Sequence, residues 1–368
     1  MKRLDRFLYQ KEKPLWERAL LFPLYLLSVP YGWAVRARLR LYDLGLLRPR
    51  RLPCPVISVG NITLGGTGKT PLTMALAEGL QDRGIKVAVL SRGYKRRKPS
   101  GPIVTDGHSV FLSPEESGDE PFLMSATLKG VPVLVGKDRF ANGELALQRF
   151  KANGFILDDG YQHLQLHRDL NILLIDATIG FGDRHLFPRG LLREPVTHLR
   201  RAHLILLTKL EDSEVSHPLE EELRSIQPSL PLFHSYYQPS GLVGPRGERQ
   251  DLALFRDRKV LAFSGIANPA YFTALLKKCG MEVIKEESFP DHHRYTAKDL
   301  EWILARSKGA DWIVTTQKDM VKLAHLNIDS LPIRALHVGM KIREEKDFFE
   351  RVMALFSVET QRRVRGTQ

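Results

Sequence analysis

From residue 52 onward, short apolar runs alternate with longer stretches in which apolar residues recur at helical spacing. The runs are almost continuously apolar, which is typical of strands that are covered on both faces of a parallel sheet. The longer stretches have the length and periodicity of amphipathic helices. The alternation therefore predicts an α/β fold, a parallel sheet flanked by helices. The expected strands of the first half are residues 54–60, 86–93, 131–136, 155–159, 169–177 and 202–209.

A polar tract with proline and glycine, residues 236–251, interrupts this alternation. Such a composition favours a loop, and we predict a linker over residues 236–252. The strand and helix pattern then starts again on a smaller scale. We therefore expect a core domain over residues 46–235 and a second, smaller α/β domain over residues 253–368.

The N-terminal region contains an uncharged apolar segment, Ala19–Val35, with basic residues on both sides. Its 17 residues fall short of the ~20 that a spanning helix needs, and Pro23, Pro30 and Gly32 interrupt it. Cations on both flanks suit a helix that lies in one membrane interface. We predict a membrane-associated helical segment over residues 1–45. A spanning helix and an ordinary buried helix are the alternatives.

The charge balance narrows the choice of partner. The chain has 368 residues with 55 Lys and Arg against 42 Asp and Glu, a net charge of +13. This excess indicates an anionic partner, such as an acidic lipid or a phosphorylated substrate. The sequence has no RNA-binding motif, zinc-finger spacing or long basic tail, so a nucleic acid partner is disfavoured. Two distant cysteines, Cys54 and Cys279, indicate no disulfide framework and fit a reducing compartment.

The stretch GNITLGGTGKT, residues 60–70, nearly matches the phosphate-binding motif G-x-x-x-x-G-K-[ST], although Thr63 replaces the first glycine. A predicted strand precedes it and a predicted helix follows it. Backbone N–H groups of such a loop converge on phosphate oxygens, with Lys69 on the outer phosphates and the Thr70 hydroxyl on Mg²⁺. The predicted nucleotide-binding residues are Thr63, Leu64, Gly65, Gly66, Thr67, Gly68, Lys69 and Thr70.

Two carboxylates, Asp158 and Asp159, end one of the predicted strands. Ligands of parallel sheets sit at the carboxyl ends of the strands, so these groups are candidates to hold Mg²⁺ together with Thr70. A helix cap followed by a turn at Gly160 is the alternative. His163 and a second histidine four residues on have no third partner at a suitable spacing, which disfavours zinc.

With these motifs in place, the chain resembles the tetraacyldisaccharide 4'-kinase family. The resemblance covers nearly the whole length and rests on GNITLGGTGKTP, LSRGY, GDEP, DRF, ILDDGYQH, HRDLNILLID, PRGLLREP, AFSGIANP, FPDHHRY and TTQKD, in the family's order. It implies transfer of the γ-phosphate of ATP, with Mg²⁺, to the 4'-hydroxyl of a tetraacylated glucosamine disaccharide 1-phosphate in lipid A biosynthesis. It also implies a place at the cytoplasmic face of the bacterial inner membrane, peripheral or monotopic.

The same resemblance assigns roles to individual residues. Asp119 of GDEP matches the base that takes the hydroxyl proton, His292 of FPDH matches its partner, and Lys69 matches the catalytic lysine of the loop. Thr70, Asp158 and Asp159 match positions near the metal. The residues that match positions in the acceptor pocket are Arg92, Tyr94, Arg139, Gln162, His163 and Arg193. The implied partners are the lipid A precursor and an anionic membrane surface, with no obligate protein partner.

The main alternative is a nucleotide-switch NTPase that controls membrane or partner binding, because the loop alone does not distinguish a kinase from a switch. The stretch LLTKLED is faintly similar to a guanine-selecting element. There, Thr208 replaces the base-reading asparagine, and the acidic residue after Lys209 is displaced to Glu211. Dependence of ATP consumption on an acceptor separates the two hypotheses.

Overall fold

The structure is a computed structural model that describes residues 21–210 and 218–365, with side chains through residue 357. Part of the predicted membrane segment, residues 1–20, and Glu211 of the LLTKLED stretch lie outside the described residues. The strands are β1 Val56–Gly60, β2 Val87–Ser91, β3 Ile103–Thr105, β4 Val133–Val135, β5 Gly154–Asp158, β6 Leu170–Asp176, β7 Leu204–Thr208, β8 Leu232–Val243, β9 Arg249–Gln250, β10 Lys259–Ser264, β11 Glu282–Ser288, β12 Trp312–Thr316 and β13 Ile333–Ile342.

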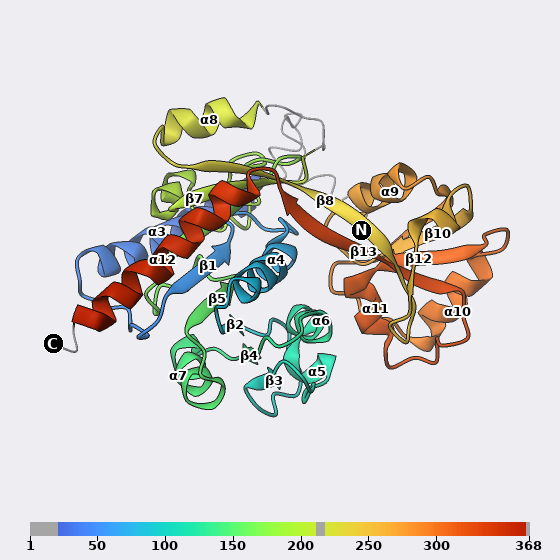
Figure 1. The fold of residues 1–368 in the computed structure, drawn as a ribbon. Coiled ribbons are helices and arrows are strands. Elements are labelled where there is room, and N and C mark those ends of the chain that lie inside the picture. The colour runs from blue at the N-terminus through green and yellow to red at the C-terminus, as the bar shows by residue number, and fades with distance from the viewer. Residues whose placement is uncertain (1–20, 211–217, 366–368) are drawn as a thin grey trace.

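Ten α-helices and two short 3₁₀ helices occur among the described residues (Figure 1). They are α3 Phe22–Asp43, α4 Lys69–Asp82, α5 Pro114–Ser117, α6 Asp119–Thr127, α7 Arg139–Phe150, η1 Val196–Arg201, α8 Leu219–Ile226, η2 Leu252–Phe255, α9 Pro269–Lys278, α10 Ala297–Arg306, α11 Gln317–Leu323 and α12 Glu345–Arg365. The predicted α/β class with helix-flanked, mostly parallel strands is confirmed.

The strands form one sheet in the order β11-β10-β12-β13-β8-β7-β6-β1-β5-β2-β4-β3, with β9 attached to β8. We call β1–β7 with their helices the large lobe, and β9–β12 with α9, α10 and α11 the small lobe. Alternate residues of β1 point into two different cores. Ile57 packs with α4 and α12 on one face, whereas Val56 packs with α7 on the other. Burial on both faces explains why these strands are continuously apolar in sequence.

Two long strands, β8 and β13, connect the lobes (Figure 1). The first residues of β8 pair in parallel with β7, and residues 235–243 then pair antiparallel with β13. The predicted linker is therefore wrong over residues 236–243, which form a strand. Pro239 and Gly241, the residues that suggested a loop, lie at a register shift opposite His337 and Val338. An irregular ladder tolerates a residue that has no N–H to donate.

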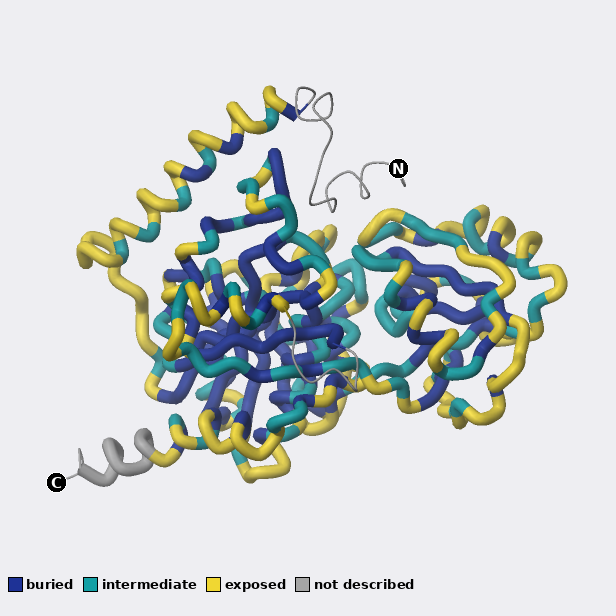
Figure 2. Tube along the Cα trace, turned by 90° about the horizontal axis from the view of Figure 1, so that it is seen from above, coloured by how far each residue is buried: buried dark blue, intermediate teal, exposed yellow. Residues whose placement is uncertain are grey.

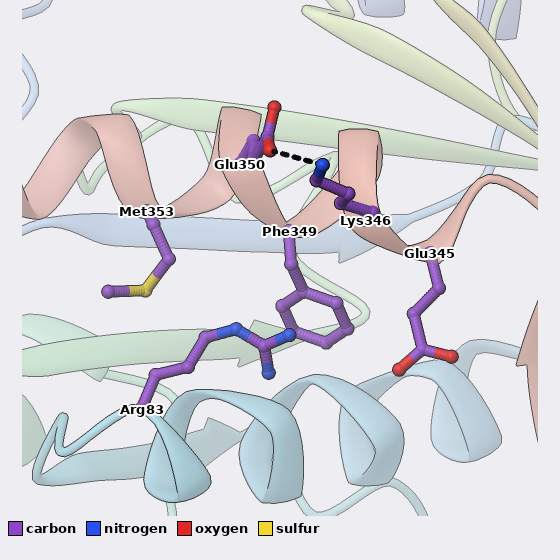
Figure 3. A pocket seen from close by; sticks show the side chains of 6 residues that line it. All are labelled: Arg83, Glu345, Lys346, Phe349, Glu350 and Met353. Atoms are coloured by element: carbon purple, nitrogen blue, oxygen red, sulfur yellow. Dashed lines mark ion pairs between the residues drawn. The ribbon is translucent and has the colours of Figure 1, made fainter.

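The chain returns from the small lobe along β13, and the last helix, α12, lies beside the large lobe (Figure 1). Phe349 is buried beside α4, where a Cβ on Gly79 would stand 2.2 Å from its ring. Figure 3 shows the Arg83 guanidinium facing the Phe349 ring, 4.1 Å from its centroid. The predicted second domain over residues 253–368 is therefore wrong in its extent, because α12 belongs to the core of the large lobe. The remaining domain boundaries stay a prediction.

The N-terminal helix α3 lies on the large lobe at the loop of residues 185–193. The Tyr31 hydroxyl donates to the Arg193 carbonyl oxygen at 2.8 Å, and the Tyr31 ring packs edge-on against Phe187. Much of the helix surface is exposed (Figure 2). Among the described residues, none of the helices has both the length and the apolarity required to cross a bilayer.

The packing of α12 generates a stability prediction. We expect Phe349→Ala to lower the free energy of unfolding by about 3–5 kcal/mol, because it leaves a cavity between α12 and α4. Urea unfolding followed by circular dichroism measures this change. Phe111→Ala is the control, because Phe111 is 54% exposed and its loss should change the free energy by less than about 0.5 kcal/mol. Equal unfolding midpoints for the two variants would contradict the assignment of α12 to the core.

Candidate functional site

The glycine-rich loop joins the carboxyl end of β1 to the start of α4. Gly68 caps the helix with a φ of 93° and Gly65 has a φ of 109°, conformations that favour glycine. A Cβ on Gly68 would stand 2.6 Å from the Tyr237 hydroxyl oxygen, so this position also has no room for a side chain. The N-terminus of α4 therefore points its backbone N–H groups and its positive dipole end at the loop, as in anion-binding sites.

Neighbouring segments fix the shape of this loop. Leu64 N donates to the Leu191 carbonyl oxygen at 2.6 Å, and Arg193 N donates to the Ile62 carbonyl oxygen at 2.7 Å. On the other side, the Thr208 hydroxyl donates to the Thr67 carbonyl oxygen at 2.9 Å. The loop is thus bonded to the PRGLLREP segment and to the end of β7, which pre-organises it for a ligand.

Lys69 occupies the centre of the site. Its Nζ lies 3.1 Å from Asn61 Oδ1 and 3.5 Å from Asp159 Oδ1. Burial lowers the pKa of Lys69, and the charge of Asp159 opposes that effect. The ammonium is therefore held in place beside the loop by a neutral oxygen and a charged one.

The two adjacent carboxylates have opposite environments. Burial raises the pKa of Asp158 to about 6, and the charge of Asp159 adds to the effect, although Ser91 Oγ donates to Asp158 Oδ2 at 2.9 Å. Burial also acts to raise the pKa of Asp159, but the charges of Lys69 and Arg193 outweigh it and hold that pKa below its ordinary value. Arg193 Nη1 contacts both oxygens of Asp159, at 3.1 and 3.0 Å.

Oxygen donors of this kind fit a hard cation. The Thr70 hydroxyl at the helix start and the carboxylates of Asp158 and Asp159 are the ligand types that Mg²⁺ prefers. No group of three or more His, Cys, Asp or Glu residues in the described part of the chain is arranged to hold a metal by itself. Mg²⁺ bound with nucleotide phosphates needs only one or two protein ligands, so the donor set fits that use.

The predicted pocket residues line the large lobe next to these carboxylates. Arg139 Nη1 contacts His163 Nδ1 at 3.1 Å, and Gln162 Nε2 donates to the Asn61 carbonyl oxygen at 2.8 Å. Burial lowers the pKa of His163 to about 3, with Arg139 and Arg168 adding to the effect, so its ring is neutral and accepts from Arg139.

Three further pocket residues differ in their surroundings. Arg92 and Tyr94 are exposed after β2, whereas Arg193 is engaged by Asp159. Among the described residues, the buried Nε atoms with no hydrogen-bond partner are those of Arg139, Arg168, Arg193 and Arg201, and the first and third of these residues are predicted acceptor contacts. Buried guanidinium donors of this kind are suited to an anionic ligand.

Asp119 and His292 meet across the two lobes. Asp119 begins α6 after Gly118, whose φ is 94°, and His292 follows β11 with a φ of 62°. His292 Nδ1 lies 3.2 Å from Asp119 Oδ2, and the Tyr94 ring packs edge-on against His292 at 5.4 Å. Burial acts to raise the pKa of Asp119, but the hydrogen bond to His292 and the charges of Lys322 and Lys318 together lower it. Asp119 is therefore an ionised, half-buried carboxylate with a positioned partner.

Sequence reasoning missed several residues that hold this site together. Asn61 bonds both Lys69 and Gln162, Ser91 bonds Asp158, and Tyr237 approaches Gly68. Asn61 and Ser91 lie inside motifs that were recognised, GNITLGG and LSRGY, where their polar side chains at strand ends were the available signal. Tyr237 carried no such signal, because it falls in the tract predicted as a linker.

The following matches to known proteins agree with one another, and each covers most of the chain. The family described as "Tetraacyldisaccharide-1-P 4'-kinase" matches residues 20–357. The tetraacyldisaccharide 4'-kinase of Syntrophus aciditrophicus is 42% identical over 341 residues, covering 89% of this chain and 91% of that protein. The one from Pelobacter propionicus is 44% identical over 315 residues, covering 84% and 85%. A crystal structure of LpxK from Aquifex aeolicus, described as an "apo" form in complex with ATP, matches with a TM-score of 0.73 and 35% identity, covering 92% and 99%.

The position of Lys69 generates a prediction. We expect Lys69→Met to lower ATP consumption by about 100-fold or more, because it removes a positioned cation from the phosphate loop. The fold should persist, because Asp159 keeps its contacts with Arg193. A coupled ADP-release assay and a thermal melting curve measure the two effects. Lys129→Met, at an exposed lysine, is the control, and equal rates for the two variants would contradict the role of Lys69.

Proposed function

The chain belongs to the tetraacyldisaccharide 4'-kinase family, and on that premise we propose that Asp119 and His292 act together as the base of its reaction. The activity is that of an ATP-dependent lipid A 4'-kinase, a phosphotransferase with an alcohol acceptor. The observation that supports the proposed pair is the contact of His292 Nδ1 with Asp119 Oδ2 at 3.2 Å. A half-buried carboxylate with an oriented imidazole is suited to accept a proton from a hydroxyl group.

In the proposed step, the 4'-hydroxyl oxygen of the glucosamine disaccharide attacks the γ-phosphorus of ATP. The new O–P bond forms as the bond from phosphorus to the bridging oxygen breaks, ADP leaves, and the hydroxyl proton passes to the Asp119 carboxylate. With a proton on Nδ1, His292 would donate to Asp119 Oδ2, 3.2 Å away, and so orient that carboxylate. Phosphoryl transfer depends mainly on positioning and charge stabilisation. These residues would therefore contribute by positioning the reacting groups.

The remaining residues of the proposed site would bind the phosphate groups of ATP. The loop N–H groups from Gly65 to Thr70 and the Lys69 ammonium would bind the phosphate chain, with Lys69 held by Asn61 and Asp159. Thr70 with Asp158 or Asp159 would hold Mg²⁺. That ion supplies charge neutralisation on the phosphate oxygens.

The acceptor would bind beside the carboxylates, at the residues that match acceptor positions of the family. These are Arg92, Tyr94, Arg139, Gln162, His163 and Arg193, of which two arginines carry buried, unpartnered Nε atoms. Arginine donors suit an acceptor that carries a phosphate group, and the Tyr94 ring packs edge-on against His292. The nucleotide-switch alternative is not favoured, because the relatives that match the chain over most of its length are named as kinases.

The proposed base generates a kinetic prediction. We expect Asp119→Asn to lower kcat by about 10²- to 10⁴-fold with little change in the KM for ATP, because a base acts in the transition state. Transfer of label from γ-³²P-ATP to detergent-dispersed tetraacyldisaccharide 1-phosphate measures the rate. An unchanged kcat would remove Asp119 from the mechanism. ATP consumption that ignores the acceptor in the wild-type protein would instead support a nucleotide switch.

The pH profile of the same assay tests the pair. The hydrogen bond from His292 is the largest effect that lowers the pKa of Asp119. His292→Phe removes it, so the pKa of Asp119 rises and the acid limb of the kcat profile moves to higher pH. His293→Phe is the matched control, because the His293 ring contacts Asp299 instead. Equal shifts of the acid limb in both variants would contradict the pairing.

We further propose that α3 binds the surface of an anionic membrane, at the cytoplasmic face of the bacterial inner membrane. Phe22, Leu26, Leu27 and Trp33 of this helix are 54–71% exposed, and exposed arginines follow at Arg36 and beyond. Apolar side chains beside cations favour an interfacial position on acidic headgroups. Such a position would bring the pocket to a lipid acceptor, because α3 contacts Arg193 through Tyr31.

The membrane proposal generates a binding prediction. We expect the double variant Leu27→Glu, Trp33→Glu to bind phosphatidylglycerol vesicles at least ~10-fold more weakly, because each side chain contributes about 1.5–3 kcal/mol when it is buried. Vesicle sedimentation measures the bound fraction. Phe111→Glu, an exposed site in another part of the large lobe, is the control. Undiminished sedimentation of the double variant would place the membrane contact outside this face of α3.

A further inference from the structure

The TTQKD segment, residues 315–319, lies at the interface of the lobes and has no role in the function described so far. It forms the end of β12 and the first turn of α11, which packs against α6 of the large lobe. α6 begins with Asp119. The segment therefore stands directly opposite the proposed base.

The first turn of α11 is fixed from within the small lobe. Asp319 is fully buried and accepts hydrogen bonds from Gly265 N at 3.0 Å and from the Thr316 hydroxyl at 2.6 Å. Tyr295 and Lys322 also contact this carboxylate, at 3.2 and 2.6 Å. A buried charge with this many partners holds its helix turn in one geometry. The residue next to it, Lys318, therefore projects from a rigid base.

Lys318 has three acceptors around its ammonium group. Nζ lies 2.8 Å from Glu120 Oε1, 3.2 Å from Asp291 Oδ1 and 3.4 Å from His292 Nε2. Glu120 belongs to the large lobe, whereas the other two acceptors belong to the small lobe. A lysine ammonium has three N–H donors and no acceptor, so this set uses its full capacity. Burial acts to lower the pKa of Lys318, but Glu120 and Asp291 outweigh it and raise that pKa, so the group is cationic.

This arrangement determines which nitrogen of His292 carries a proton. Because Lys318 can only donate, Nε2 of His292 must present its lone pair to Nζ. The carboxylate oxygens nearest to Nε2, on Glu120 and Asp291, are farther away, each at 3.8 Å. When the ring carries a single proton, that proton is then on Nδ1, the atom that faces Asp119 Oδ2. Second partners of this kind commonly fix the tautomer of a functional histidine.

We propose that Lys318 is a positioning residue, which sets the Nδ1–H tautomer of His292 and ties that ring to the large lobe through Glu120. The proposal rests on the proposed function of Asp119 and His292 as the base pair. Lys318 itself lies behind the imidazole, on the side away from Asp119. Besides the effect of its charge on Asp119 described above, it would act on the reaction through His292, by keeping a hydrogen-bond donor directed at the base.

A neighbouring ion pair provides the matched control. Arg294 of the small lobe contacts Glu115 of the large lobe, so it also joins the lobes. It follows His292 by two positions in the sequence, but none of the contacts described for the His292 ring involves it. Loss of Arg294 therefore weakens the interface without changing the donors and acceptors around His292.

The test combines NMR with kinetics on the full-length protein. In ¹⁵N-histidine-labelled protein, the signals of His292 are identified by their loss in His292→Phe. We expect Nδ1–H in the wild type and a substantial Nε2–H population in Lys318→Met, because the two nearby carboxylates then become the nearest partners of Nε2. The kcat of Lys318→Met should fall by about 10- to 100-fold with the KM for ATP unchanged.

The other variants make the outcome decisive. Lys318→Arg, which keeps the cation and its donors, should retain the Nδ1–H tautomer and recover kcat to within about 5-fold of the wild type. Arg294→Met should leave the His292 signals unchanged. An unchanged His292 tautomer or an unchanged kcat in Lys318→Met overturns the proposal. Full activity of Asp119→Asn instead defeats the proposed function, while the NMR signals still report whether Lys318 sets the tautomer.

Discussion

The contact between Asp119 and His292 is the constraint on which the proposed site depends. The two residues are 173 positions apart and belong to different lobes, so neither lobe contains the pair by itself. The ladder of β8 with β13 and the ion pairs at the interface keep the lobes in the relation that the contact requires. A base assembled only when two parts of a chain meet is a common way to restrict phosphoryl transfer to the intended acceptor.

Charge is distributed unevenly within this site. Asp158 and Asp159 are adjacent in sequence, yet the pKa of one is raised by burial and that of the other is lowered by Lys69 and Arg193. The difference follows from the neighbours of each side chain: Asp158 accepts a hydrogen bond from the neutral Ser91 hydroxyl, whereas Asp159 contacts the cations of Lys69 and Arg193. Asp159 is thus already paired with positive charges, while Asp158 has a weaker, neutral partner in Ser91. Because their environments differ, two neighbouring carboxylates can have different roles when a metal ion binds together with its nucleotide.

The sequence predicted the parts of the molecule that are determined locally. The glycine-rich loop between β1 and α4, its flanking strand and helix, and the carboxylates at the end of β5 all follow from short motifs and apolar patterns. The predictions from the sequence were wrong where pairing between distant segments of the chain determines the structure. Residues 236–243 contain Pro239 and Gly241 and look like a loop, but β13 supplies a partner for their backbone. The return of α12 to the large lobe and the place of Lys318 beside His292 likewise depend on tertiary contacts that no local pattern encodes.

The pair of strands that joins the lobes has a mechanical consequence. A single flexible tether would let the small lobe tumble and reach the large one from any direction. Two strands bonded along residues 235–243 resist stretching and in-plane bending. The directions from which the small lobe can approach the large one are therefore fewer than with a single tether. The imidazole would return to the carboxylate from a restricted range of orientations.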